Sequence, residues 1–259
     1  TNRTATKAGR FAAGREFLDV ARDMGLPAEV SHIGSMAAFG QMEEFLKMVD
    51  AYRLNGVDVT CDCYPYYAFS TAIGSTTYDE GWRQRYHCDY DVVQLCEGDY
   101  QGQRCTEEIF EDVRRTHPEY LTVCYVMKEQ EVDMALRNPG VMIGSDGILN
   151  HGQGHPRAAG AFLRVFSQFV RNGKLSLYEA IRKMTAMPAA RMGLSRKGNL
   201  AAGADADVVI FDPNVIIDGA TFENPVLPGK GISYVLIGGQ VAARDCQVVQ
   251  WHLGRSVRK

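Results

Sequence analysis

The chain has 259 residues, of which 46% are hydrophobic and 23% charged, and its formal net charge is −3. This balance gives no support for binding to nucleic acid or to an anionic membrane surface. No apolar run is long enough to span a bilayer and no signal peptide opens the chain, so we expect neither a membrane nor a nucleic-acid partner.

Helices and strands are predicted to alternate in the first part of the chain. Apolar residues recur at helical spacing and then in short runs, and Gly25 with Pro27 ends the first helix. The predicted elements are a helix over 9–24, a strand over 28–32, a helix over 41–54 and a strand over 57–62. This order is typical of βα units in a parallel sheet.

Residues 74–118 interrupt this alternation. They are rich in aromatic, charged and cysteine residues and show no long period, so we expect an insertion above the strand ends, in the manner of a lid. The regular pattern then returns with a strand over 123–127, a helix over 130–137 and a strand over 141–145.

The last part of the chain changes from helices to short strands. Two helices are predicted over 158–172 and 176–191, and Ser176 is the expected N-cap of the second, with Glu179 at the third helical position. The strands that follow are predicted over 206–212, over 234–237 and 240–241 as a hairpin, and over 246–249.

Seven cysteines, an odd number, are scattered along the chain. This pattern is typical of reduced thiols rather than of a disulfide framework, so we expect a cytoplasmic protein. Cys61 and Cys63 are two residues apart and would share one face of a strand. A zinc knuckle needs a different spacing and a second pair of ligands, so we expect no structural zinc there.

One short run stands out for its chemistry. Ile143-Gly144-Ser145-Asp146-Gly147 puts a carboxylate directly after a buried apolar run, and His155-Pro156-Arg157 follows closely. A carboxylate at the carboxyl end of a parallel strand lies where α/β-barrel enzymes hold their catalytic residues. Ser-Asp-Gly is also a common turn sequence, so the run by itself leaves both interpretations open.

Several motifs follow one another in a specific order along the chain. They are Ser31-His32; Asp62-x-Tyr64-Pro65-Tyr66-x-Ala68-x-Ser70-Thr71; Ser145-Asp146-Gly147; His155-Pro156-Arg157; Lys183-Met184-Thr185-x-x-Pro188-Ala189; and Gly203-x-x-Ala206-Asp207-Val208-Val209-Ile210-Phe211-Asp212. In this order and spacing the chain resembles the D-aminoacylase, or N-acyl-D-amino-acid deacylase, branch of the amidohydrolase superfamily. The resemblance covers nearly the whole chain and is weakest in residues 74–118.

The resemblance implies an α/β fold, the C-terminal half of a TIM (β/α)8 barrel (about strands 5–8) with the C-terminal strands of a small β-sandwich. His32, Asp62 and Asp146 would end the sixth, seventh and eighth strands. The barrel part would cover residues 1–195, including the insertion, and the sandwich part residues 196–259. We expect the missing half of the barrel, or a homo-oligomer mate, to cover the open sheet edges and the apolar face.

The same resemblance implies a metal-dependent hydrolase of linear C–N amide bonds in a small-molecule N-acyl amino acid. One or two Zn²⁺ ions would lower the pKa of a bound water and so supply the nucleophile. His32 would be a zinc ligand, and Asp146 would be the general acid and base and would also touch a metal. Tyr64 would polarise the amide carbonyl, and Ser70 with Arg157 would hold the substrate carboxylate.

Each of these residues also has a purely structural interpretation. His32 could be a satisfied histidine at a strand end, Tyr64 part of an aromatic turn, and Arg157 the partner of a nearby carboxylate. Asp62 is expected to orient a neighbour rather than to touch substrate. The other histidines are expected to be solvated, at the surface or capping: His87, His117, His151, His155 and His252.

Two positions depart from the pattern of this family. The histidine expected at the end of the fifth strand falls near Asn2, a poor zinc ligand beside an imidazole, and Gly34 stands where a lysine is often found. One histidine and one aspartate fall short of the three protein ligands usual at catalytic zinc. We therefore expect this chain alone to bind zinc weakly or not at all, and to be inactive.

Other functions are compatible with the sequence. The residues at Asn2 and Gly34 suit an amidohydrolase with a cyclic amide substrate, and loss of the fifth-strand histidine suits a catalytically inactive binding or structural relative. An N-terminal nucleophile hydrolase that uses Thr1 is disfavoured, because nothing downstream resembles the layered sheets of that class.

Overall fold

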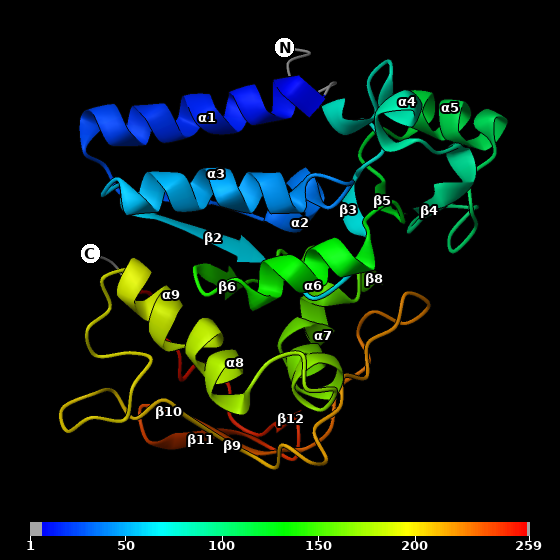
Figure 1. Ribbon diagram of the computed structural model, residues 1–259. Coiled ribbons are helices and arrows are strands. Elements are labelled where there is room, and N and C mark those ends of the chain that lie inside the picture. Colours follow the sequence, from blue (N-terminus) through cyan, green and yellow to red (C-terminus); the bar gives the residue numbers. More distant parts are fainter. Residues whose placement is uncertain (1–6, 258–259) are drawn as a thin grey trace. The chain divides into compact units, whose positions relative to one another are not determined.

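The computed structural model describes residues 7–257, which form two compact units (Figure 1). The first unit runs to Val141 and includes Asp146–His155, and the second combines Met142–Ser145 with Pro156 and the residues after it. The division at residue 196 into a barrel part and a sandwich part stays a prediction. Within the described range, no helix has both the length and the apolar character needed to cross a membrane.

A three-stranded sheet with the order β1-β2-β6 follows the predicted alternation of helices and strands. Its strands are β1 (Ala28–Val30), β2 (Val59–Cys63) and β6 (Val141–Ile143). The helices that alternate with them are α1 (Lys7–Met24), α2 (Ile33–Ala37), α3 (Met42–Leu54) and α6 (Glu129–Arg137). Strands β1 and β2 run parallel on either side of α3 in the sequence, which confirms the βα unit predicted there.

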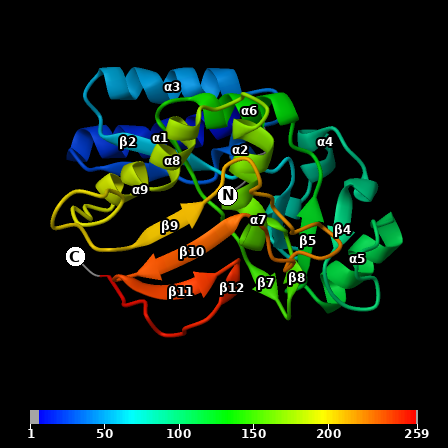
Figure 2. The same ribbon diagram turned by 90° about the horizontal axis from the view of Figure 1, so that it is seen from below.

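Helices α1 and α3 lie side by side (Figures 1 and 2). Leu18 of α1 and Val49 of α3 are fully buried. Strand β2 alternates buried and half-buried residues, so Cys61 and Cys63 share its buried face, as predicted. Burial raises the pKa of the Cys61 thiol to about 12, and all seven cysteines are free thiols in the structure.

Arg53 joins α3 to the strands beside it. Its guanidinium donates to the carbonyl oxygen of Val59 at 2.8 Å and to that of Gly140 at 2.7 Å. It also pairs with Asp50 at 2.7 Å and lies 3.8 Å from Cys61 Sγ. These contacts connect the end of α3 with β2 and with the turn that precedes β6.

Replacing Gly140 by alanine is expected to lower the free energy of unfolding by about 1–3 kcal/mol. A methyl group on Gly140 would lie 2.3 Å from Nη1 of Arg53, so the guanidinium would have to leave its acceptors. Urea unfolding of the complete protein measures this effect. In an Arg53→Ala background the same change should cost little, and equal costs in the two backgrounds would contradict the explanation.

The insertion has a fold of its own, which we call the insertion segment and define as residues 69–124. Three strands, in the order β3-β5-β4, form an antiparallel sheet: β3 (Phe69–Ala72), β4 (Val93–Leu95) and β5 (Leu121–Cys124). The helical elements are η2 (Thr76–Tyr78), α4 (Trp82–Tyr86), η3 (Tyr90–Val92) and α5 (Glu107–Thr116). The strand predicted over 123–127 is β5, which begins two residues earlier and pairs antiparallel with β3 and β4.

An aromatic cluster fills the insertion segment. The rings of Trp82 and Phe110 stack with centroids 5.4 Å apart, and Tyr78 meets both rings edge-on. Thr106 is the N-cap of the ten-residue helix α5, and its hydroxyl accepts from the backbone N–H of Ile109. The sequence predicted an insertion without a long period and therefore missed this amphipathic helix. A lid role for the insertion segment stays a prediction.

Helices open the second unit. They are α7 (Arg157–Arg164), a π-helical continuation (Val165–Val170), α8 (Leu177–Met184) and α9 (Ala186–Arg191). The hydroxyl of Ser176 accepts from the backbone N–H of Glu179 at 3.1 Å, which confirms the predicted N-cap of α8. The Glu179 carboxylate pairs instead with Arg182, and that guanidinium lowers the pKa of the carboxyl group.

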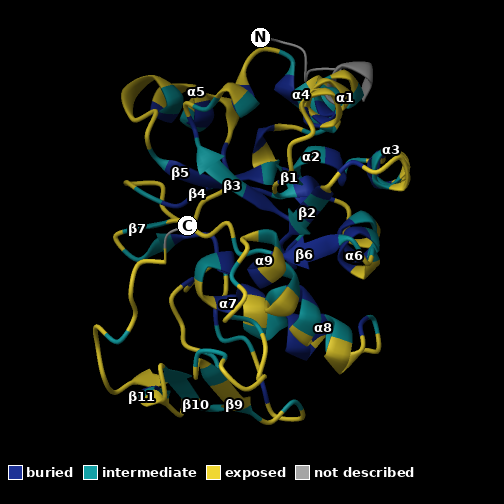
Figure 3. Cartoon of the chain, turned by 90° about the vertical axis from the view of Figure 1, so that its left-hand side faces the viewer, coloured by how far each residue is buried: buried dark blue, intermediate teal, exposed yellow. Residues whose placement is uncertain are grey.

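A four-stranded antiparallel sheet with the order β12-β11-β10-β9 completes the second unit. Its strands are β9 (Val208–Phe211), β10 (Ile232–Ile237), β11 (Gln240–Arg244) and β12 (Gln247–Val248), which confirms the predicted hairpin (Figure 2). Much of this sheet is exposed or half-buried, whereas β1 and β2 are mostly buried (Figure 3). The rings of Phe166 and Phe211 lie 4.8 Å apart and connect the helices with β9.

Candidate functional site

Three polar residues lie on or just beyond neighbouring strands of the β1-β2-β6 sheet. His32 comes directly before α2 and shortly after β1, Asp62 lies in β2, and Asp146 follows β6. The main-chain N–H of His32 donates to Oδ1 of Asp62 at 2.8 Å. The structure therefore brings His32 and Asp62 together, and Asp62 orients a neighbour as predicted.

The backbone at His32 has a left-handed conformation, with φ of 43°. Residues other than glycine adopt this conformation at a cost, and such strain tends to occur at functional positions. Ser35 stabilises the turn, since its Oγ lies 2.9 Å from the carbonyl oxygen of His32 and 2.9 Å from Nδ1 of the same ring. His32 is half-buried.

Asp146 has the same unusual backbone conformation, with φ of 49°. Aspartate tolerates this region better than most residues, which suits a tight change of direction after β6. The chain then forms a short hairpin of β7 (Leu149–Asn150) and β8 (Gln153–Gly154). The Asp146 side chain is exposed, as a residue that exchanges protons with a reactant needs to be.

Tyr64 is fully buried beside His155, and their ring centroids are 6.2 Å apart. The Tyr64 hydroxyl lies 3.6 Å from Sδ of Met127. His155 is also fully buried, meets the Tyr66 ring edge-on at 5.0 Å, and bonds the carbonyl oxygen of Ala68 through Nε2 at 3.1 Å. The expectation that His155 is solvated was wrong, because aromatic rings and a main-chain acceptor from the 64–68 segment enclose it.

The two residues predicted to bind a carboxylate belong to different units. Ser70 lies in β3 of the first unit and is half-buried. Arg157 is the first residue of α7 in the second unit and is 3% exposed. Each therefore stays a predicted binding residue. The exposed histidines are at the surface as predicted: His87, His117, His151 and His252.

The residues present fit part of a zinc site. An imidazole and a carboxylate are donors that zinc accepts, and the Ser35 contact is the kind of outer hydrogen bond that ligand histidines make. Among the residues that the structure describes, no group of three histidine, cysteine, aspartate or glutamate side chains could hold a metal ion. Further ligands would come from beyond these residues, and Asn2 lies outside them. Weak zinc binding by this chain alone stays a prediction.

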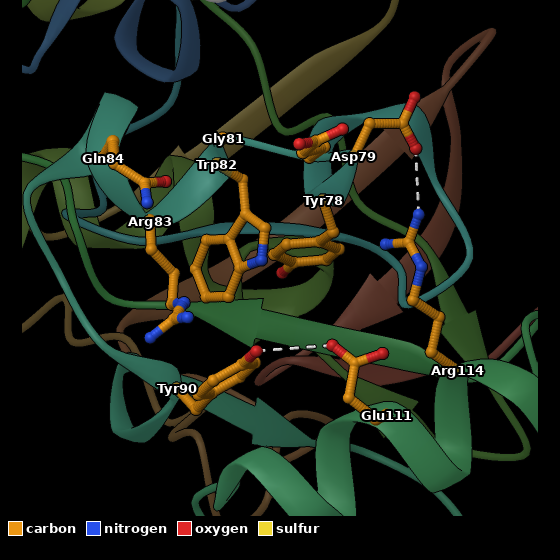
Figure 4. A pocket seen from close by; sticks show the side chains of 10 residues that line it. Tyr78, Asp79, Gly81, Trp82, Arg83, Gln84, Tyr90, Glu111 and Arg114 are labelled. Atoms are coloured by element: carbon orange, nitrogen blue, oxygen red, sulfur yellow. Dashed lines mark hydrogen bonds and ion pairs between the residues drawn. The ribbon is translucent and has the colours of Figure 1, made fainter.

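A separate cavity of about 540 Å³ lies in the insertion segment (Figure 4). Tyr78 and Trp82 point into the middle of it, and its polar groups bond one another: Arg114 with Asp79 at 2.9 Å, and the Tyr90 hydroxyl with Glu111 at 3.3 Å. None of the predicted site residues lines this cavity. It is therefore distinct from the candidate site at the ends of β1 and β6.

Comparison with known proteins gives consistent matches along the chain. A family model described as the amidohydrolase family matches residues 13–243. The N-acyl-D-glutamate deacylase of Alcaligenes xylosoxydans xylosoxydans is 34% identical over 241 residues, which is 88% of this chain and 48% of the relative. The chain spans about half the length of the curated relatives it matches.

Solved structures agree with these matches. A crystal structure of D-aminoacylase superposes with a TM-score of 0.83 and 29% identity, over 96% of this chain and 53% of that one. The N-acyl-D-glutamate deacylase of Bordetella bronchiseptica, complexed with zinc and a phosphonate mimic of the tetrahedral intermediate, superposes with a TM-score of 0.77 and 30% identity. That match covers 92% of this chain and 52% of the other. The small sheets of this chain are consistent with part of a barrel.

Proposed function

Because this chain belongs to the amidohydrolase family, we propose that the complete protein is a zinc-dependent deacylase of N-acyl-D-amino acids. The observation that carries the proposal is the 34% identity to an N-acyl-D-glutamate deacylase along 88% of the chain. The positions of His32 and Asp146 at the ends of β1 and β6 support it, because metal ligands and catalytic acids lie at the carboxyl ends of barrel strands.

Zinc would supply an activated water at neutral pH when it is bound by His32, Asp146 and ligands from outside the described residues. Asp146 would take the proton of the water that attacks the amide carbon. It would then return this proton to the leaving nitrogen as the C–N bond breaks. The products are a carboxylic acid from the acyl group and a free D-amino acid.

Tyr64 would polarise the amide carbonyl by donating a hydrogen bond from its hydroxyl to the carbonyl oxygen. In the structure this hydroxyl lies against the sulfur of Met127, and a thioether is a weak acceptor. A substrate oxygen on which negative charge develops is a far better acceptor, so the hydroxyl would turn to it. Ser70 and Arg157 would hold the carboxylate of the substrate.

A cyclic amide substrate is the second candidate, and the packing at Gly34 favours it. A Cβ atom at this position would lie 2.9 Å from Cε of Met127 and 3.0 Å from Sγ of Cys63. The lysine often found here in the resembled family would therefore have to displace the Met127 side chain. Loss of that charge next to His32 would suit a substrate that lacks a free carboxylate.

The two candidates are separated by assaying the complete protein, supplied with zinc, on N-acetyl-D-amino acids and on hydantoin and dihydrouracil. We expect hydrolysis of the acyl amino acids, with acidic side chains included in the panel. Turnover of the cyclic amides alone would select the second candidate. No turnover of either class by zinc-loaded protein would instead support an inactive binding or structural relative.

We also propose a cellular compartment and a partner for the chain. The free state of all seven cysteines supports a reducing compartment such as the cytoplasm. Strands β1 and β6 are the outer strands of their three-stranded sheet in the described chain, and large apolar side chains such as Leu54 are exposed. These features support a missing barrel half, or a homo-oligomer mate, as the partner that covers them.

A further inference from the structure

Ser35 makes two contacts with one residue, His32. Its Oγ lies 2.9 Å from the carbonyl oxygen of His32 and 2.9 Å from Nδ1 of the ring. We propose that Ser35 is a positioning residue that fixes the tautomer of His32, with the proton on Nδ1 and the lone pair on Nε2. Nε2 is then the nitrogen that faces a metal, and only this last step rests on the proposed function.

The assignment follows from counting protons. A carbonyl oxygen can only accept, and two oxygens 2.9 Å apart attract each other only with a proton between them, so we assign the single hydroxyl proton of Ser35 to the His32 carbonyl, which also accepts from the N–H of Ser35 at 3.0 Å. Towards Nδ1 the same hydroxyl oxygen can then only accept, and Nδ1 must carry a proton. A neutral imidazole has one ring proton, so Nε2 keeps its lone pair, which is the form that binds a metal.

The backbone around α2 fixes the positions of His32 and Ser35 relative to each other. His32 directly precedes α2, and Ser35 lies in the first turn of that helix, so the two are three residues apart on one local structure. The N–H of His32 donates to Asp62 in the neighbouring strand, and its carbonyl accepts from Ser35. These two bonds stabilise the left-handed conformation of His32, which is unfavourable for a residue other than glycine.

No other side chain among the described residues hydrogen-bonds the His32 ring in the structure, so a change at Ser35 acts on the tautomer without a competing contact. Ser35→Ala removes the hydroxyl and is compatible with folding, because alanine is the better helix former. Ser35→Thr keeps a hydroxyl at the same atom. Ser31→Ala is the matched control, since Ser31 is the exposed residue on the other side of His32.

The experiment measures the ¹⁵N chemical shifts of the His32 ring in the complete, metal-free protein, at a pH where the imidazole is neutral. Selective labelling with ¹⁵N-histidine gives the signals, and a His32→Gln variant assigns them. We expect a protonated Nδ1 and an unprotonated Nε2 in the natural protein, in Ser35→Thr and in Ser31→Ala. In Ser35→Ala the two nitrogens should move towards the averaged shifts of interconverting tautomers.

A zinc titration of the same four proteins then tests the functional step. Loss of an outer hydrogen-bond partner typically weakens metal binding about 10- to 100-fold, so Ser35→Ala should show that loss and the other two variants should not. A protonated Nε2 in the natural protein, or unchanged shifts in Ser35→Ala, would overturn the proposal. A tautomer set as expected in a protein that binds no zinc would leave Ser35 in its positioning role and refute the proposed zinc chemistry.

Discussion

Exchanging Asp146 for asparagine is expected to lower kcat of the complete protein on an N-acyl-D-amino acid by about 10²- to 10⁴-fold, with little change in KM. An amide keeps the size of the carboxylate but can neither take the proton of the attacking water nor return it to the leaving nitrogen. The exposed side chain after β6 has few packing constraints, so the exchange should leave the fold intact. Steady-state kinetics with zinc in excess measure the effect.

Asp62→Asn is the matched control, because it makes the same carboxylate-to-amide change on the neighbouring strand. The amide oxygen can still accept from the N–H of His32, so we expect a loss of less than about tenfold. A loss at Asp62 as large as that at Asp146 would move the general-base role to Asp62. Nearly full activity of Asp146→Asn would remove the proton-transfer role assigned to Asp146.

The regular helices could be predicted because local signals agree with the tertiary structure. The apolar faces of α1 and α3 recur at helical spacing, and glycine, proline or asparagine follows each of them. The N-cap of α8 at Ser176 is likewise a local feature, and the structure confirms its bond to Glu179. The β10–β11 hairpin has Gly238-Gly239 between its strands, a short-range signal of a tight turn.

The insertion segment could not be predicted in the same way because its sheet depends on distant pairing. Strand β3 pairs with β5, with Phe69 opposite Cys124, and the helix α5 lies between β4 and β5 in the sequence. Neither strand has a turn that would reveal its partner. From the sequence, residues 123–127 were therefore expected to continue the alternation of strands and helices. In the structure β5 pairs antiparallel with β3 and β4 instead.

At the candidate site, the residue types could be predicted but their surroundings could not. The burial of His155 depends on Tyr66 and on the carbonyl of Ala68, which are far from it in the sequence. Its position in a glycine-rich loop predicts solvent exposure instead. The contact of Ser35 with His32, by contrast, had a local signal, since a serine three residues after a strand-end residue can bond back to it.

Arg157 could bind the substrate carboxylate or only support the structure, and comparing a substrate that has this carboxylate with one that lacks it separates the two roles. Its side chain is 3% exposed, and in such a shielded place the attraction between a guanidinium and a carboxylate exceeds its value in water. Arg157→Gln should therefore lower kcat/KM for an N-acyl-D-amino acid by about 10- to 100-fold, corresponding to the loss of a charge-assisted hydrogen bond. Most of the loss should appear in KM.

The methyl ester of the same N-acyl-D-amino acid contains the same scissile amide but no negative charge. Arg157→Gln should change kcat/KM for the ester by less than about threefold, because no carboxylate is left for the guanidinium to recognise. Arg157→Lys should fall between the two, since it keeps the charge and loses the bidentate fork. Equal losses on the acid and on the ester would show that Arg157 acts by supporting the structure around α7, and the carboxylate would then need another partner.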